Sequence, residues 1–245
     1  MIDDIRTVMW KEIKEIVATQ GTTRGGIFRF VLAFGLLSIY FPLTMGRSII
    51  DESTFLIFYI CIPIFFGIVI VPDSFAGERE RHTLETLLAS RLSDRAILSG
   101  KLLVCVLYSF IMTLMFIVLC LAVVNIAYWN GQLLTYPAAL LEFALVVALL
   151  LDTLFAAIGV LISLRAPTVR QSSETMFMVI FALAAIPFAL YFILPQGLKN
   201  SLLNWLSTTD PAIVGLVVLA VLAVACFIAL YAAMLNFRRS KLILE

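Results

Sequence analysis

Charged residues and histidine are scarce in this 245-residue sequence. Asp, Glu, Lys and Arg together make up 13% of the chain, histidine occurs once, and 62% of the residues are hydrophobic. The mean hydropathy of +1.08 lies well outside the range of a soluble domain. The composition therefore excludes an ordinary soluble protein and predicts a chain that resides in lipid. The net charge of +1 predicts no nucleic-acid-binding surface.

The sequence also offers little for metal or redox chemistry. Its single histidine, His82, excludes a histidine-rich metal site, and we expect it to be a solvated surface residue. Each cysteine lies within an apolar run and none belongs to a CxxC motif; they are Cys61, Cys105, Cys120 and Cys226. We interpret the cysteines as small hydrophobic residues.

A nucleotide-binding loop is missing as well. Lys101 follows Gly100, but Arg95 stands where the Gly-x-x-x-x-Gly-Lys pattern needs its first glycine, and no Ser or Thr follows the lysine. We therefore expect that the chain does not bind and hydrolyse ATP by itself.

Acidic residues are rare within the apolar segments. Only Asp152 lies deep in one, and Glu142 precedes it by ten residues, about 15 Å along a helix, so the two carboxyl groups cannot share a proton or a metal. A carboxyl group in lipid is costly, so Asp152 is by default a functional candidate facing the bundle interior, a partner or a water-filled cavity. The alternative is a structural carboxyl group that is protonated or hydrogen-bonded to a neighbouring helix.

Six apolar runs reach the roughly 20 residues that a helix needs to cross a bilayer. They lie at about 27–45, 55–71, 102–126, 138–162, 176–194 and 212–235. These runs predict an all-α polytopic membrane protein with a single transmembrane domain over 1–245. The first run follows a charged segment, so we expect it to remain as an anchor and not to be removed as a signal peptide.

Lys and Arg are concentrated on one side of this predicted topology. Fifteen of the 17 fall there: Arg6, Lys11, Lys14, Arg24, Arg29, Arg79, Arg81, Arg91, Arg95, Lys101, Arg165, Arg170, Arg238, Arg239 and Lys241. The opposite side holds only Arg47 and Lys199. Because cytoplasmic loops retain Lys and Arg, both termini are predicted to be cytoplasmic, in a multi-pass protein of the plasma membrane.

Two segments outside the spans are predicted to form amphipathic helices. In 2–18, apolar residues recur at three- and four-residue spacing opposite a charged face: Ile2, Ile5, Met9, Ile13, Ile16 and Val17. This pattern predicts a helix in the inner membrane interface, and the alternative is a cytoplasmic helix packed on protein. In the outer loop 195–211, leucines and Trp205 alternate with polar residues. We expect a short helix there that can re-enter the outer leaflet, with Trp205 at the headgroup level.

The connection 73–101 is long and densely charged. A stripe of Leu84, Leu87, Leu88 and Leu92 predicts an amphipathic helix, preceded by a cluster of acidic and basic residues. Ser93 followed by Asp94 predicts the start of the next helix, which leads into the third span.

Residues of this connection resemble the signature of a known family. They are Phe75, Glu78, Arg79, Glu80, Thr83, Leu84, Glu85, Leu87, Leu88, Ser93, Ile97, Gly100 and Lys101. Together with the six spans, the amphipathic amino-terminal segment and the outer loop, they resemble the permease subunits of type-2 (ABC-2) ABC transporters over essentially the whole chain. The segment 163–174 is similar, more weakly, to the second cytoplasmic contact of that family.

The resemblance implies a half-transporter without an enzymatic activity or cofactor of its own. Two permeases, identical or paired with a paralogue, would surround a pathway in the bilayer and sit on two separate ABC ATPase subunits that bind ATP and Mg. A coupling helix in the region 76–92 would dock in a groove of the ATPase and carry its closure to the membrane. The residues implied for this coupling are Glu78, Arg79, Glu80, Thr83, Leu84, Glu85, Leu87 and Leu88. We expect its charged members to make polar contacts to the bundle or the ATPase, and its leucines to pack.

The resemblance also suggests that the second and fifth spans form the pathway walls. Phenylalanines are frequent in both: Phe58, Phe65 and Phe66 in the second, and Phe177, Phe181 and Phe188 in the fifth. With Asp152 they are candidate pathway residues for a hydrophobic or amphipathic substrate; the alternative is that the rings face lipid or pack. Two other functions stay open: a membrane scaffold or regulator driven by an associated ATPase without transport, and an ion-coupled secondary transporter, which rests on Asp152 alone.

Overall fold

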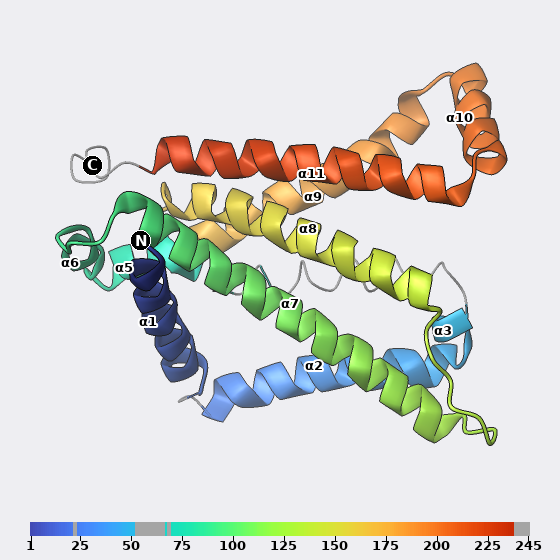
Figure 1. Cartoon of the computed structure of the whole chain (residues 1–245), viewed down its shortest axis with the longest axis horizontal. Helices are drawn as coiled ribbons and strands as arrows, with labels where there is room; N and C mark the ends of the chain where they lie inside the picture. The colour runs from blue at the N-terminus through green and yellow to red at the C-terminus, as the bar shows by residue number, and fades with distance from the viewer. Residues whose placement is uncertain (22–23, 52–66, 68–69, 238–245) are drawn as a thin grey trace.

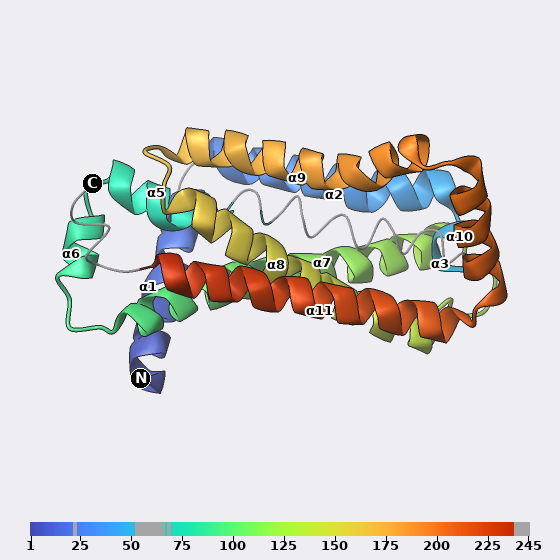
Figure 2. The same cartoon turned by 90° about the horizontal axis from the view of Figure 1, so that it is seen from above.

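The computed structural model describes residues 1–21, 24–51, 67 and 70–237, and the regular structure in these residues is helical. Five long helices run lengthwise beside one another (Figures 1 and 2): α2 (Arg24–Met45), α7 (Asp94–Ala127), α8 (Ala138–Ser163), α9 (Val169–Ile193) and α11 (Pro211–Asn236). The predicted all-α class is confirmed for this part of the chain.

Three of these helices, α7, α8 and α11, are long and apolar enough to cross a membrane. They match the predicted third, fourth and sixth spans, while α2 and α9 cover the first and fifth. Nearly all of the predicted second span, 55–71, lies outside the described residues, together with Phe58, Phe65 and Phe66. Six crossings therefore stay a prediction.

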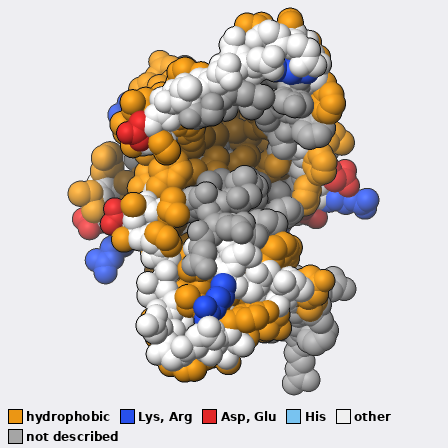
Figure 3. Space-filling view, turned by 90° about the vertical axis from the view of Figure 1, so that its right-hand side faces the viewer, with side chains coloured by type: hydrophobic (Ala, Val, Ile, Leu, Met, Phe, Trp, Pro, Cys, Tyr) orange, Lys and Arg blue, Asp and Glu red, His pale blue; other side chains and the backbone are white. Residues whose placement is uncertain are grey.

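Short helices gather at the two ends of the bundle. At one end lie α1 (Ile2–Gly21), α5 (Asp73–Glu80), α6 (Leu84–Leu88) and the last turn of α11 (Figure 1). We call this the charged end, because α1 and α5 carry clustered Lys, Arg, Asp and Glu. The opposite end holds α3 (Ser48–Asp51) and α10 (Gln196–Thr208), where charged side chains of both signs are scattered among hydrophobic ones (Figure 3). This segregation agrees with the predicted charge asymmetry; the cytoplasmic placement of the charged end stays a prediction.

The start of α7 follows the predicted capping signal. The Ser93 hydroxyl accepts a hydrogen bond from the backbone N–H of Ala96 at 3.3 Å, and the helix begins at Asp94. At 34 residues, α7 is about 51 Å long and exceeds the roughly 30 Å hydrocarbon core, so its first turns belong to the charged end. The short helix expected in 195–211 is present as α10; its depth in the leaflet stays a prediction.

α1 is the predicted amino-terminal helix, but its buried face is not the predicted apolar stripe. Val8 and Glu12 are buried, whereas Ile2, Ile13 and Val17 are exposed. The helix packs against α7 at Gly100, where an added Cβ would lie 2.7 Å from Val8 Cγ1. α1 therefore has one side on protein, as in the alternative interpretation, and exposed apolar residues on another, as an interfacial helix needs.

The predicted leucine-striped helix is present as α6 but ends at Leu88, and the charged cluster that precedes it forms a separate helix, α5. His82 adopts a left-handed conformation with φ of 56° and separates α5 from α6, and Leu92 lies in the loop beyond α6. The N–H of Thr83 bonds the carbonyl of Glu78 and the N–H of His82 bonds that of Arg79, at 2.9 and 3.1 Å. These bonds form a Schellman motif, in which glycine usually occupies the left-handed position. Because a histidine occupies this position, the sequence does not indicate the left-handed turn.

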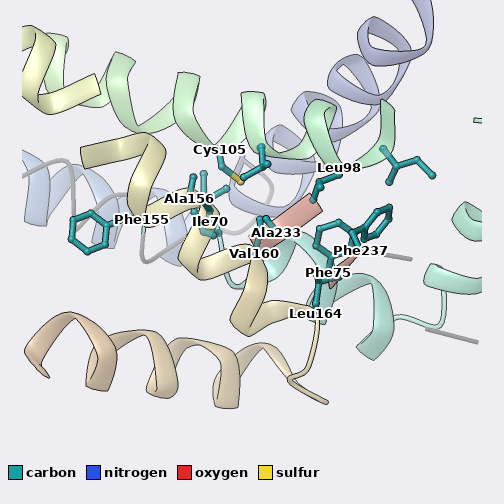
Figure 4. Packing of buried hydrophobic residues seen from close by; sticks show 14 of the residues in the cluster. Ile70, Phe75, Leu98, Cys105, Phe155, Ala156, Val160, Leu164, Ala233 and Phe237 are labelled. Atoms are coloured by element: carbon teal, nitrogen blue, oxygen red, sulfur yellow. The ribbon is translucent and has the colours of Figure 1, made fainter. Parts of the chain in front are cut away.

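The described core forms two clusters along the bundle. One surrounds Phe34, Phe116 and Cys120 between α2 and α7. The other packs against α5 and joins it to α7, α8 and α11 (Figure 4). In the second cluster, the Phe75 and Phe237 rings lie 5.3 Å apart between centroids. The described cysteines, Cys105, Cys120 and Cys226, are free and buried, as expected for small hydrophobic residues, and Cys61 lies outside the described residues.

Candidate functional site

The most densely bonded polar region of the described structure surrounds α5 at the charged end. Five of its eight residues are buried, although the helix is polar. It is enclosed by α1, α7 and the ends of α8 and α9. We call α5 and the side chains that bond it directly, or through Lys101 or Arg81, the joint: Lys11, Glu12, Glu15, Lys101 and Ser163.

α5 and α8 cap one another. α5 has no side-chain cap of its own, but the Ser163 hydroxyl accepts from the N–H groups of Phe75 and Ala76, at 3.1 and 2.8 Å, and donates to the Pro72 carbonyl at 2.8 Å. In return, the Arg79 guanidinium donates to carbonyl oxygens just beyond the end of α8. These are the carbonyls of Leu164 and Ala166, at 2.8 and 2.9 Å. Each helix therefore satisfies backbone groups of the other, and neither can shift alone without losing hydrogen bonds.

α5 also holds the first residue of α9. Glu80 Oε2 accepts from the backbone N–H of Val169 at 3.1 Å. A carboxylate at a helix N-terminus is favoured by the helix dipole. With Arg79, Glu80 clamps both ends of the short connection between α8 and α9.

A completely buried ammonium group links α5 to α7 and α1. Lys101, on α7, has a side chain with 0% exposure. Its Nζ lies 2.8 Å from Glu12 Oε1, 3.2 Å from Glu78 Oε1 and 2.6 Å from the Ser74 carbonyl oxygen, and 5.0 Å from the Phe75 ring centroid. Since an unpaired charge at such a site would be very costly, these contacts fix α1 and α5 on α7.

Further ion pairs extend this cluster to the surface. Lys11 bonds Glu78 Oε1 from the solvent side, and Arg81 bonds both Asp73 and Glu15, the latter at 2.6 Å. The Asp73–Arg81 pair crosses directly over Gly77, where an added Cβ would overlap both side chains. Glycine at position 77 therefore allows this pair to form.

The protonation of the cluster follows from burial and neighbouring charges. Burial raises the pKa of Glu12, and Lys101 opposes this rise. Burial acts to lower the pKa of Lys11, but the hydrogen bond and attraction of Glu78 outweigh it, so its pKa is raised. Lys11 therefore stays charged at neutral pH, while Glu12 binds a proton more readily than an exposed glutamate.

The joint has the ligand types for a metal ion, but ammonium groups already occupy it. Carboxylate oxygens of Glu12, Glu15 and Glu78 lie within 4.8 Å of one another. Lys11 and Lys101 bond these same carboxylates and neutralise them. The adjoining cavity of about 20 Å³ is large enough for one water molecule, and Glu78 Oε2 is buried without a hydrogen-bond partner among the described residues. The arrangement favours a structural ion network over a metal centre.

α6 continues from the joint to the surface. Leu84 and Leu87 are buried in the core cluster that packs against α5, while Thr83 and Glu85 are exposed; the Leu88 side chain is outside the description. Glu78, Arg79 and Glu80 bond the bundle. Among the charged residues implied for coupling, Glu85 therefore differs from these three, because it is exposed on the side of α6 that faces away from the bundle.

The candidate pathway residues lie apart from the joint. Asp152 is 4% exposed on α8, and its Oδ2 has no hydrogen-bond partner among the described residues. Phe177 and Phe181 are 45% and 75% exposed on α9, so neither ring is enclosed by the described residues. The side chain of Phe188 is outside the description.

The contacts of Lys11, Glu12, Lys101 and Ser163 in the joint were not predicted from the sequence. One signal was available for Lys101: on a helix it shares a face with Ile97 and Cys105, both buried, so its charge had to be paired. Its partner Glu12 is 89 residues distant, and a single sequence does not show that pairing.

Comparison with known proteins gives one match. A protein-family model described as ABC-2 family transporter protein matches residues 7–242. No curated protein and no solved structure matches the chain.

Proposed function

The chain belongs to the ABC-2 family of transporters, and from this membership we propose that it is the permease subunit of an ATP-driven exporter. The ATP would be bound and hydrolysed, with Mg, by two separate ATPase subunits. Two copies of the chain, or one copy and a paralogue, would form the pathway. The substrate would be hydrophobic or amphipathic, in keeping with the apolar, phenylalanine-rich spans.

The joint is the observation that carries this proposal. An ATPase at the charged end can act on the spans only through groups that are fixed to them. α5 is bonded to α1 and α7 through Lys101, to α8 through Ser163 and Arg79, and to α9 through Glu80. Because close-packed and hydrogen-bonded elements move as units, a displacement of α6 would be transmitted to several spans at once.

α6 supplies the surface that would dock in the ATPase. Its buried leucines hold it to the bundle, and Thr83 and Glu85 face outward. A short helix seated in a groove of a partner is a common recognition mode. We propose that Glu85 contacts the ATPase, whereas Glu78, Arg79 and Glu80 transmit its motion within the permease.

The proposed pathway would form between two copies. Phe177 and Phe181 are exposed on α9, so a second permease or the second span would have to cover them to enclose a substrate. The buried carboxyl group of Asp152 would lie on the inner side of this wall. Aromatic rings with few polar groups suit an amphipathic molecule.

Co-purification tests the proposed partner. Wild-type permease, expressed with a candidate ABC ATPase from the same genome and captured by an affinity tag, should retain that ATPase through washing. Glu85→Ala should reduce retention about tenfold, as expected for an interface anchor. Glu174→Ala is a matched control, since Glu174 is exposed and pairs with Arg170 on its own helix. Failure to retain the ATPase, or equal retention by Glu85→Ala, would contradict the docking role.

An ion-coupled secondary transporter is a second candidate, favoured by the buried and unpartnered Oδ2 of Asp152. In that case, a fluorescent amphiphile would be moved in reconstituted vesicles by an ion gradient without ATP, and Asp152→Asn would abolish the movement. Movement that requires ATP and persists in Asp152→Asn would exclude this candidate.

A further inference from the structure

A groove on the bundle surface lies between α7 and α11 near the charged end. Both helices pack against α8, which contributes Thr153 to the floor of the groove. Its volume is about 290 Å³. The lining side chains include Arg95, Ser99, Leu103, Val106, Leu230 and Met234.

The interior of this groove is effectively apolar. The hydroxyl groups that line it bond within their own helices: Ser99 donates to the Arg95 carbonyl at 2.6 Å, and Thr153 to the Leu149 carbonyl at 2.7 Å. No hydroxyl hydrogen is therefore free for a polar ligand. The remaining lining is leucine, valine and methionine, which suits a hydrocarbon chain.

A positive charge lies where the groove reaches the charged end of the bundle. Arg95 is exposed in the first turn of α7, and among the described residues no carboxylate pairs with its guanidinium. A helix N-terminus adds partial positive charge at the same place. This end is complementary to an anion.

The groove crosses the level at which α7 enters the membrane. Arg95 lies in the first turn of α7, which belongs to the charged end, whereas Val106 lies within the predicted third span, 102–126. The two residues are eleven positions apart, which is about 16 Å of helix rise. A molecule with its anionic group at Arg95 would therefore have its headgroup at the membrane surface and a chain that enters the leaflet next to the charged end.

We infer that this groove binds one anionic phospholipid from that leaflet, with its phosphate at Arg95 and one acyl chain between α7 and α11. The inference rests on the membrane-spanning helices and does not depend on the proposed transport function. A bound lipid would fill the space that α7 and α11 leave above α8, and would link these helices.

Native mass spectrometry of the purified, detergent-solubilised permease tests the inference. With phosphatidylglycerol and phosphatidylcholine of identical chains, we expect one tightly bound phosphatidylglycerol and a preference of about fivefold, the effect of one basic residue at an anionic headgroup. Arg95→Gln should remove the preference. Arg91→Gln should keep it, because Arg91 is exposed but does not line the groove.

A second variant tests the acyl-chain position without changing charge. Leu103→Trp should block binding of both lipids, because Leu103 lines the groove and is 43% exposed. Ile111→Trp is the control, on the same helix, 50% exposed and outside the groove. Free glycerol phosphate should not compete, because it lacks the chain.

Several results would overturn the inference. They are equal binding of the two lipids by the wild type, a retained preference in Arg95→Gln, unchanged binding in Leu103→Trp, or competition by glycerol phosphate. Disulfide cross-linking of two Leu103→Cys chains in membranes would also overturn it, because a second copy would then cover the groove.

Discussion

Lys101→Met should destabilise the protein strongly, because it removes the buried cation that neutralises two carboxylates. The side chains of Glu12 and Glu78 are 11% and 2% exposed, so neither can recover its solvation by turning to water. Breaking a buried ion pair from one side costs about 3–5 kcal/mol. For a chain of this length that corresponds to a fall in melting temperature of about 6–20 °C.

The stability lost in Lys101→Met should depend on pH. In the wild type the folded-state pKa of Glu12 is raised above its ordinary value of 4.5, so the folded protein binds this proton more tightly than the unfolded one. Lys101 lowers this pKa, so its removal raises it further. The stabilising contribution of protonation is present at low pH and lost as the pH rises through the folded pKa. The cost of Lys101→Met should therefore be largest near pH 8 and shrink toward pH 5.

Thermal unfolding of the detergent-solubilised protein, followed by size-exclusion chromatography after heating, provides the measurement. Glu12→Gln/Lys101→Met should recover at least about 1 kcal/mol relative to Lys101→Met, because coupled charges are non-additive. Lys14→Met is the control: Lys14 is exposed and lies over the Trp10 ring at 5.1 Å, a contact of about 0.5–1 kcal/mol. A Lys101→Met protein as stable as the control, or a double variant less stable than either single one, would refute the reasoning.

Substitutions at three further sites test the local geometry by the same unfolding assay. His82→Gly should be neutral or stabilising by up to about 1 kcal/mol because position 82 has a φ of 56°, whereas His82→Val should destabilise by about 1–2 kcal/mol; equal effects would exclude the left-handed turn. Gly100→Ala should cost about 1–3 kcal/mol, because the added methyl would lie 2.7 Å from a valine of α1; Gly35→Ala, with nothing within 4 Å of the added methyl, is its control and should not destabilise. Ser163→Ala should cost about 1–3 kcal/mol by leaving the first N–H groups of α5 unpaired; Ser173→Ala, which loses a bond only within its own helix, should cost far less, and equal losses would contradict the capping role.

Helices with a strong local signal could be predicted from the sequence. Apolar length alone located α7, α8 and α11, and the Ser93 cap located the first residue of α7. Such features depend on neighbouring residues, which a sequence shows directly.

Features that depend on contacts between residues far apart in the chain could not be predicted from the sequence. The apolar periodicity of α1 predicted a helix but not its buried face, because this helix has protein on one side and exposed apolar residues on another. Val8 and Glu12 are buried only because Gly100 and Lys101 of α7 lie against them. The break at His82 likewise needs backbone geometry that residue types do not reveal.

The candidate site was partly predictable. The resemblance identified Glu78, Arg79 and Glu80 as important, and the structure places all three in bonds to the bundle. It did not identify Ser163 as the cap of α5 or Lys101 as the buried cation, because both roles join elements far apart in the chain.

The most direct test of the joint is whether its contacts carry an ATPase cycle to the far end of the bundle. Spin labels at Ile126 and Ile193, which are 81% and 77% exposed at the ends of α7 and α9, report this motion in a cysteine-free permease bound to its ATPase. Arg79→Ala/Glu80→Ala removes the clamp on α8 and α9. Its control, Arg170→Ala/Glu174→Ala, removes an equally charged but exposed pair on α9.

Adding ATP and vanadate should shift the distance distribution in the wild type and in the control, as measured by double electron–electron resonance. The Arg79→Ala/Glu80→Ala complex should still hydrolyse ATP but show no shift. A full shift in that variant would contradict the account, because the motion would then reach the spans without the joint.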